Sequence, residues 1–222
     1  SLIDIRRRIR SVKNTQQITK AMKMVSAAKL RRAQERVIAA RPYAQTMREM
    51  LANLTAASGS AENAESPWLS RREPKRIDLI MMSSDTGLAG AFNSNLLKAA
   101  LKFYDDHKGA EIYLTLVGRK GRDFFRKRPS NILADYINIL NRPSYADAAG
   151  IAKEVIRRYR DGETDAVYIL NNEFKSVMTQ KLTVLQVLPL EVEGTAAPAA
   201  QDYIYEQEPL SMLEQLIPRY VE

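Results

Sequence analysis

Residues 76–97, RIDLIMMSSDTGLAGAFNSNLL, decide the fold class of this sequence. The stretch begins with an apolar run, continues through a turn that contains Gly87 and Gly90, and ends in a helical pattern. A strand, a glycine turn and a helix N-terminus together often bind anions, because backbone N–H groups and the helix dipole face the turn. The first question is therefore whether this turn binds a phosphate.

Neither of the common phosphate-binding patterns is complete in this turn. A P-loop needs two glycines separated by four residues and followed by lysine, whereas Gly87 and Gly90 are separated by two residues and the next lysine is Lys98. The dinucleotide fingerprint G-x-G-x-x-G does not match either. We interpret the turn as structural, with Asp85 or Asn93 capping the helix that follows. It predicts no nucleotide and no other cofactor.

Strand and helix patterns alternate on both sides of this turn. Strands are predicted at 77–84, 111–118, 132–139 and 165–173, and helices at 93–107, 119–128 and 144–162. Residues 176–191 alternate between apolar and polar side chains, which is typical of an antiparallel edge strand. The order predicts an α/β fold, a Rossmann-like and mostly parallel sheet with helices on both faces. We expect this body to span 76–207, after a linker at 58–75.

The N-terminal segment, 1–57, has a different pattern. Residues 2–56 contain no glycine and are rich in strong helix formers. Apolar residues recur at alternating steps of four and three, which is the pattern of a coiled-coil seam. The seam consists of Ala33, Val37, Ala40, Ala44, Met47, Leu51 and Leu54. This phase continues through Pro42, so we predict one long kinked helix of about 80 Å. A second helix is expected to begin in 208–222, interrupted at Pro218.

Charge is concentrated in the same segment. The chain carries a net charge of +8, and residues 1–60 hold 13 lysines and arginines against three acidic residues, a net +10 that leaves −2 for the remaining 162 residues. Such a segment favours an acidic partner. Three kinds of partner fit: nucleic acid, an anionic membrane surface and acidic protein loops. Since residues 1–42 contain no aromatic side chain to stack on a base, the pattern favours protein, and no specific nucleic-acid partner is expected.

Candidates for other chemistry are few. The sequence contains no cysteine and one histidine, His107, which excludes thiol catalysis and leaves little material for zinc sites. Asp105, Asp106 and His107 are adjacent, but we interpret them as the polar end of a helix. The GRKG stretch at 118–121 resembles the loop of KH domains, but it follows a strand and is interpreted as a turn. No small-molecule substrate is predicted.

Several long stretches resemble the gamma subunits of F-type ATP synthases. They are IRRRIRSVKNTQQITKAMKMVSAAKLRRAQ at 5–34, RPYAQTM at 41–47, SSDTGLAGAFNSN at 83–95, VGRKGRDFFRKR at 117–128 and LIPRYVE at 216–222. The resemblance covers the whole chain. Thr86 departs from it, because the family usually carries a basic residue after the aspartate of the glycine turn.

The resemblance implies a function as a central rotor shaft. In this family the N-terminal helix pairs with a long C-terminal helix, and the coiled coil rotates inside a ring of alpha and beta subunits. The α/β body lies at the foot, against the epsilon subunit and the membrane-embedded rotor ring. Rotation couples proton movement to the catalytic sites of the surrounding subunits, and the shaft itself catalyses nothing. The implied turn residues are Asp85, Gly87 and Gly90.

The resemblance also implies partners and a location. The shaft residues expected to contact the catalytic subunits are Lys20, Met22, Lys23, Lys29, Arg31, Arg32 and Arg36. As part of the complex, the chain is expected at the cytoplasmic face of the cell membrane as a peripheral component. A sequence without cysteine differs from the thiol-regulated chloroplast form, and no transit segment is recognised, so we expect a bacterial source. The alternative function is a basic coiled-coil protein that binds nucleic acid and carries an α/β domain.

Overall fold

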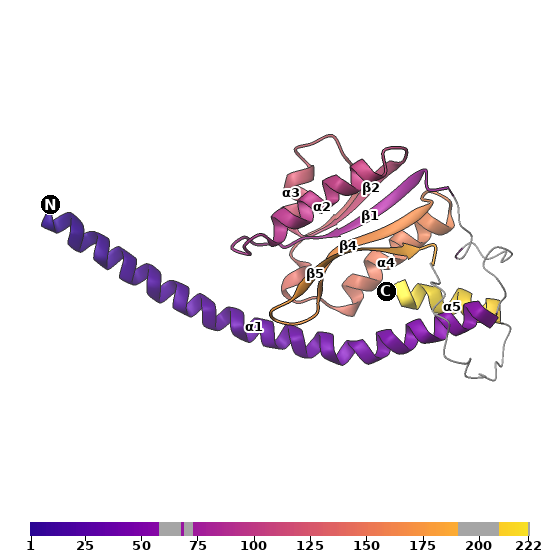
Figure 1. Ribbon diagram of the computed structural model, residues 1–222, viewed down its shortest axis with the longest axis horizontal. Helices are drawn as coiled ribbons and strands as arrows, with labels where there is room; N and C mark the ends of the chain where they lie inside the picture. The colour runs from indigo at the N-terminus through magenta and orange to yellow at the C-terminus, as the bar shows by residue number, and fades with distance from the viewer. Residues whose placement is uncertain (58–67, 69–72, 191–208, 222) are drawn as a thin grey trace. The chain divides into compact units, whose positions relative to one another are not determined.

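A computed structural model of the chain describes residues 1–57, 68, 73–190 and 209–221 (Figure 1). The helices are α1 (Leu2–Ala57), α2 (Phe92–Asp106), α3 (Arg119–Phe125), α4 (Tyr145–Arg160), α5 (Pro209–Val221) and a 3-10 turn, η1 (Ile139–Asn141). The strands are β1 (Arg76–Met82), β2 (Glu111–Val117), β3 (Asn131–Tyr136), β4 (Ala166–Phe174) and β5 (Gln180–Leu188). The chain forms two compact units, Ser1–Glu49 and Met50–Glu222.

Helix α1 confirms the long N-terminal helix. It runs through 56 residues with Pro42 inside it, so the proline does not end the helix. Proline removes one backbone N–H donor, but the alanines, lysines, arginines and glutamines around it favour helix. The unit Ser1–Glu49 consists of this helix alone, and most of its side chains are exposed. A helix of that composition has no core of its own, so most of its apolar side chains are exposed, with Met47 as a buried exception.

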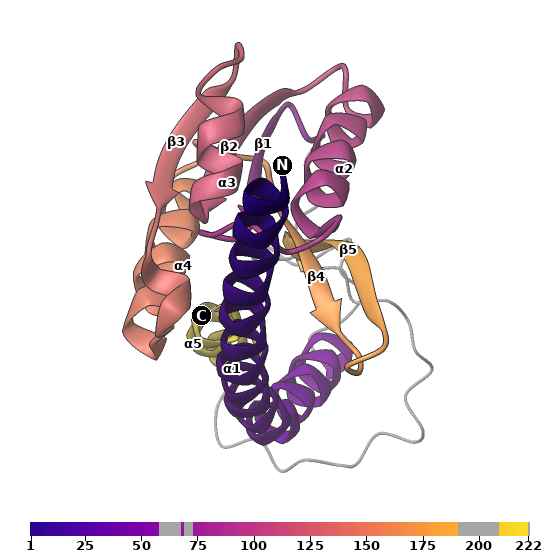
Figure 2. The same ribbon diagram turned by 90° about the vertical axis from the view of Figure 1, so that its left-hand side faces the viewer.

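The body confirms the predicted sheet. Its strand order is β3-β2-β1-β4-β5, with β1, β2, β3 and β4 parallel and β5 antiparallel to β4. The chain moves from β1 to β2 to β3 in one direction and then crosses back to β4 on the other side of β1. Because such crossovers are right-handed, α2 and α3 cover one face and α4 the other (Figure 2). Successive strands are therefore added on one side of β1 up to β3 and on its other side from β4 onward, while β1 and β4 themselves stay parallel.

The two faces of the sheet differ in chemistry. The side chains of β1 alternate, so Ile77, Leu79 and Met81 enter the apolar core under α2 and α3, while Asp78 faces α4. Helix α2 contributes Leu96, Ala100 and Phe103 to that core, all buried. The α4 side combines buried apolar residues with one buried ion pair. The fold therefore has one apolar interface and one mixed interface.

Pro218 does not interrupt the last helix, because α5 continues to Val221 and buries Leu213 and Ile217 one turn apart. The expectation of an interruption was wrong, since a proline costs a helix one donor and this packing offsets that loss. The linker at 58–75 lies mostly outside the described residues. Trp68 is described, and it is buried, with its ring stacked 5.9 Å from that of Tyr159.

Candidate functional site

The glycine turn is held closed by the carboxylate that precedes it. Asp85 Oδ1 accepts hydrogen bonds from the backbone N–H groups of Arg119 and Asn138, each at 3.0 Å. These donors lie at the start of α3 and at a left-handed residue after β3. The Asp85 carboxylate thus ties the glycine turn to the segments that follow β2 and β3. This arrangement supports the structural interpretation of the turn.

The expected cap of α2 was wrong. The N-cap position of α2 is Ala91, and no side chain bonds to the free N–H groups there. Asn93 instead accepts from the Ser84 N–H at 3.1 Å and donates to the Ser84 hydroxyl at 2.8 Å. Asp85 therefore connects the turn to α3, and Asn93, the second residue of α2, connects that helix to Ser84 after β1.

Glycines in this region serve two different purposes. Gly90 adopts a positive φ of 55°, which favours glycine, but Gly87 does not, and the residue with positive φ beside it is Leu88 at 60°. Gly118 combines a φ of 102° with a close approach, because a Cβ there would lie 2.3 Å from the Ser83 carbonyl oxygen. The Ser83 hydroxyl also accepts from the Gly121 N–H at 2.8 Å. The GRKG stretch is thus a tight junction between β1 and α3.

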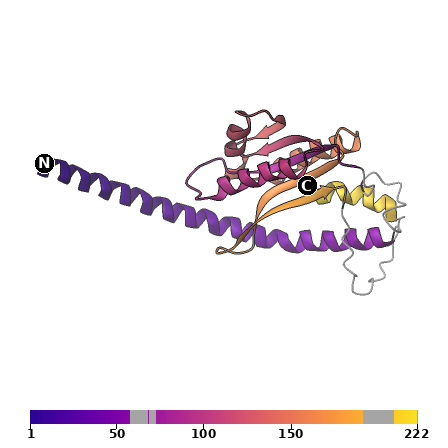
Figure 3. The ribbon, with the colours of Figure 1, turned by 45° about the horizontal axis from the view of Figure 1, so that its top comes forward.

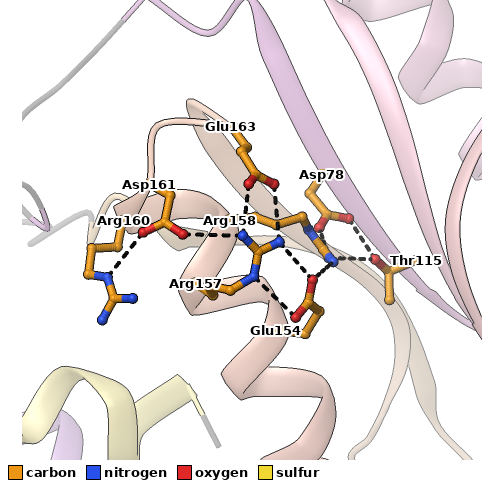
Figure 4. A network of polar contacts seen from close by, with 8 residues as sticks. All are labelled: Asp78, Thr115, Glu154, Arg157, Arg158, Arg160, Asp161 and Glu163. Atoms are coloured by element: carbon orange, nitrogen blue, oxygen red, sulfur yellow. Dashed lines mark hydrogen bonds and ion pairs between the residues drawn. The ribbon is translucent and has the colours of Figure 1, made fainter.

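A buried ion pair crosses from the sheet to α4 (Figure 4). The Arg158 Nη2 atom lies 2.5 Å from Asp78 Oδ2 and 3.1 Å from the Thr115 hydroxyl, which in turn donates to Asp78 Oδ1 at 2.9 Å. The Asp78 side chain is 0% exposed and that of Arg158 is 6% exposed. Burial raises the pKa of the Asp78 carboxyl, and the neighbouring Arg158 guanidinium opposes this rise. The pair fixes α4 on β1.

The pair continues outward into a surface network. Glu154 binds Arg158 at 3.2 Å and Arg157 at 2.9 Å, and Arg157 reaches Glu163 at 2.8 Å and Asp161 at 3.2 Å. The hydrogen bond from Arg157 holds the pKa of Glu154 below its usual range. Sequence analysis missed this network. The signal available was Asp78, an acidic residue inside an otherwise apolar strand.

The predicted contact residues of the shaft are all exposed, but they do not share one face. They are Lys20, Met22, Lys23, Lys29, Arg31, Arg32 and Arg36. At about 100° per residue, Lys20 and Arg31 point within roughly 20° of each other, whereas Lys29 points to the opposite side. Positive charge therefore surrounds the helix. Arg31 pairs with Glu35 at 3.0 Å, with both side chains largely exposed.

The predicted seam lies along one stripe of α1 and changes in burial along its length. Ala33, Val37, Ala40 and Ala44 are exposed, and Val37 is 40% exposed. Met47, Leu51 and Leu54 are 7%, 5% and 2% exposed. The seam as a coiled-coil contact stays a prediction.

Among the described residues, no group of three or more metal-ligating side chains is placed to hold an ion. His107 ends α2, where its Nδ1 atom lies 2.9 Å from the Phe103 carbonyl oxygen and its ring stacks on that of Phe103. Asp105 lies beside it and pairs with Lys108 at 3.5 Å. This is the polar helix end expected from the sequence.

Comparison with known proteins identifies the family. Residues 1–222 match the family described as ATP synthase. The ATP synthase gamma chain of Solibacter usitatus is 56% identical over 223 residues, covering 100% of this chain and 77% of the relative. The chain belongs to the ATP synthase gamma chain family. The gamma chain of Geobacter metallireducens is 48% identical over 225 residues, with the same coverage. The resemblance read from the sequence motifs is confirmed.

The gamma chain fold agrees with solved structures. A chain of the Tetrahymena thermophila mitochondrial ATP synthase central stalk and c-ring superposes with a TM-score of 0.65 at 23% identity, covering 92% of this chain and 87% of that chain. At that identity the likeness concerns the fold, which is a long N-terminal helix followed by a mostly parallel sheet with helices. Among the described residues, none of the helices is long and apolar enough to cross a membrane.

Proposed function

We propose that this gamma-family chain is the central rotor shaft of an F-type ATP synthase. Residues 1–57 form the shaft, 76–207 form the foot, and 208–222 begin the second helix of the stalk. Rotation of the foot by the membrane-embedded rotor ring turns the shaft inside the ring of alpha and beta subunits and changes their catalytic sites in sequence. The epsilon subunit binds at the foot, and the complex lies at the cytoplasmic face of a bacterial membrane.

The observation that carries this proposal is the exposed, basic helix of the unit Ser1–Glu49. Its lysines and arginines surround the helix, and of the described cationic side chains in 20–36 only Arg31 forms an ion pair within the chain. A rod with charge on every side can meet a ring of acidic loops in any rotational position, whereas a single basic face could meet only one. Free cations on all sides are therefore suited to a rotating contact.

The chain itself is proposed to be non-catalytic. The turn at the carboxyl end of β1, where α/β enzymes commonly bind ligands, carries the acidic Asp85 and lacks the lysine of a P-loop. Calorimetric titration of the purified chain with ATP and magnesium tests this. Saturable binding tighter than about 100 μM, or roughly −5.5 kcal/mol, would contradict the proposal.

Charge reversal tests the shaft contact. Lys20→Glu with Lys23→Glu should weaken assembly with the alpha and beta subunits by up to about tenfold, because exposed ion pairs contribute modestly and are screened by salt. The matched control is Lys98→Glu with Lys102→Glu, two exposed lysines on α2. We expect the control to assemble like the wild type. Equal effects of the two double variants would show that net charge alone matters.

The second candidate is nucleic-acid binding, which the same +10 segment would support. Non-specific binding to DNA should be weak at about 150 mM salt, on the order of 10⁻⁴ to 10⁻⁶ M, and steeply dependent on salt. A nanomolar, sequence-specific complex would favour this candidate over the rotor.

A further inference from the structure

The β4–β5 ribbon extends beyond the rest of the sheet. The pairing of β1 with β4 ends at Met81 and Leu170, whereas β4 and β5 remain paired as far as Phe174 and Gln180. Residues 171–174 of β4 therefore bond to β5 alone. A two-stranded ribbon is only marginally stable by itself in water. This ribbon is reinforced by side chains as well, since the Thr183 hydroxyl donates to Asn171 Oδ1 at 2.7 Å.

The tip of the ribbon is ordered and apolar. The Ser176 N–H donates to the Thr179 carbonyl at 2.9 Å, and the Thr179 N–H donates back to the Ser176 hydroxyl at 3.1 Å. Between these two residues lie Val177, 53% exposed, and Met178, 93% exposed. An adaptable methionine side chain held outward by a closed turn is a feature of protein-binding surfaces.

The ribbon tip shares one edge of the body with the glycine turn. Both follow the carboxyl ends of parallel strands, β4 and β1, which lie side by side in the sheet. Figures 1 and 3 show the β1–α2 loop and the β4–β5 ribbon projecting from the same end of the body. That loop carries Leu88, which is 92% exposed and held at a positive φ. Positive φ is unfavourable for a bulky residue, so an apolar side chain is presented here at a cost in backbone strain.

Charges around the two apolar tips favour an acidic partner. Lys120 lies beside the loop, with its Nζ atom 4.0 Å from the position of a Cβ on Gly87, and Lys181 is exposed on the ribbon. Of the acidic groups nearby, Asp85 accepts two backbone N–H groups through Oδ1 while its Oδ2 atom is buried away from solvent, and Glu173 pairs with Lys175 at 2.5 Å. The edge thus offers apolar tips flanked by cations that are free among the described residues.

We propose that the β4–β5 ribbon tip, Val177 and Met178, is a docking element that inserts into an apolar depression rimmed by carboxylates on the subunits surrounding the shaft. This inference rests on the proposed function. The tip and Leu88 would form two apolar contacts on one edge of the foot, with Lys120 and Lys181 supplying the charge complementarity. The body would then contact the ring through its own surface in addition to the shaft.

Competitive assembly tests the proposal. Equal amounts of the tagged wild-type chain and a variant chain of the same length are mixed with limiting alpha and beta subunits, and the share of each in the assembled complex is measured. Met178→Asp should be recovered in fewer than about one in ten complexes, a tenfold preference that corresponds to about 1.4 kcal/mol. Met178→Leu keeps the apolar tip and should compete equally. The matched control, Leu101→Asp, changes an exposed apolar residue on α2 and should also compete equally.

Each other outcome has a distinct meaning. An equal share for Met178→Asp would overturn the docking element while leaving the rotor proposal intact, provided that the wild-type chain assembles. Failure of the wild-type chain to assemble would contradict the proposed function itself. The tip could instead contact lipid, so binding is also measured to vesicles of phosphatidylcholine with about 30 mol% phosphatidylglycerol. Vesicle binding by the wild type that Met178→Asp abolishes would replace the protein partner with a membrane surface.

Discussion

Breaking the buried ion pair between Asp78 and Arg158 should strongly lower the free energy of unfolding of the body, although the pair joins only one helix to the sheet. In Arg158→Met, the Asp78 carboxylate would remain 0% exposed with Thr115 as its main hydrogen-bond donor. Removal of one partner from a buried pair costs about 3–5 kcal/mol, because an uncompensated charge is left in the interior. Since whole domains are stable by about 5–15 kcal/mol, this loss is a large fraction of the total.

The double variant Asp78→Leu with Arg158→Met separates charge burial from packing. Replacement of both partners by apolar residues of similar size removes the charge and is often close to neutral. We therefore expect the double variant to be more stable than Arg158→Met alone. Urea unfolding of the full chain, followed by circular dichroism, measures each free energy. The matched control is Arg157→Met, whose side chain is 40% exposed, and it should cost much less than Arg158→Met.

The single variant should also respond to pH. Loss of Arg158 removes the group that opposes the raised pKa of Asp78, so the folded state would bind a proton there more tightly than the unfolded chain does. The stability deficit of Arg158→Met should therefore shrink as the pH falls from about 8 to about 5. If the free energy of unfolding of Arg158→Met lies within about 1 kcal/mol of the wild-type value, or if the double variant is no more stable than Arg158→Met, this reasoning is refuted.

Three further predictions concern other elements. Ser144→Ala removes half of the capping box of α4 and should cost about 1 kcal/mol; it should also return the lowered pKa of Asp147, which NMR titration measures, toward its ordinary value. In the wild type, the stability that the Asp147 carboxylate contributes is fully present above its ordinary pKa and is lost as the pH falls through its lowered pKa. An unchanged Asp147 pKa in the variant would contradict the role of the capping box. Gly118→Ala should strongly destabilise the body because its Cβ would meet backbone at 2.3 Å, while Gly109→Ala, with nothing within 4 Å, should have little effect; similar urea midpoints for both would contradict the close approach. Amides of residues 30–46 in the isolated chain should exchange faster than those of the central strands, unless sedimentation shows self-association; slow exchange in a monomer would mean that the lone helix is stable.

The long helix and the alternating strands and helices of the body could be predicted because both produce a periodic pattern of apolar residues over short stretches of sequence. The seam in α1 and the apolar runs of β1 and β2 are visible in any short window of sequence. Long-range pairings were not predictable in the same way. Asp85 bonds to Arg119 and Asn138, residues 34 and 53 positions away, and nothing near Asp85 in sequence indicates that choice. The assignment of Asp85 to the nearest helix therefore failed.

The candidate site was predicted less completely than the fold. Exposure of the shaft residues follows from their charge, and their spread around α1 follows from the helix period of about 100° per residue. Burial of Arg158 was not predictable from α4, where Arg157 and Arg160 are basic as well. It becomes predictable only when the crossover brings α4 over Asp78. Pro218 was judged by its local cost, and the burial of Leu213 and Ile217 outweighed that cost.

The ion pair between β1 and α4 also determines where the helix lies along the sheet. Val155 and Ala152 are apolar and compact, so their packing alone would tolerate several placements of α4 along the sheet. A slip by one residue turns a helix by about 100° and advances it by about 1.5 Å, and Arg158 would then no longer meet Asp78. A misplaced α4 leaves the Asp78 carboxylate buried on β1 without its partner, so the pair penalises wrong placements more than it stabilises the right one. This polar contact in a largely apolar layer therefore selects one position of α4 more than it adds stability.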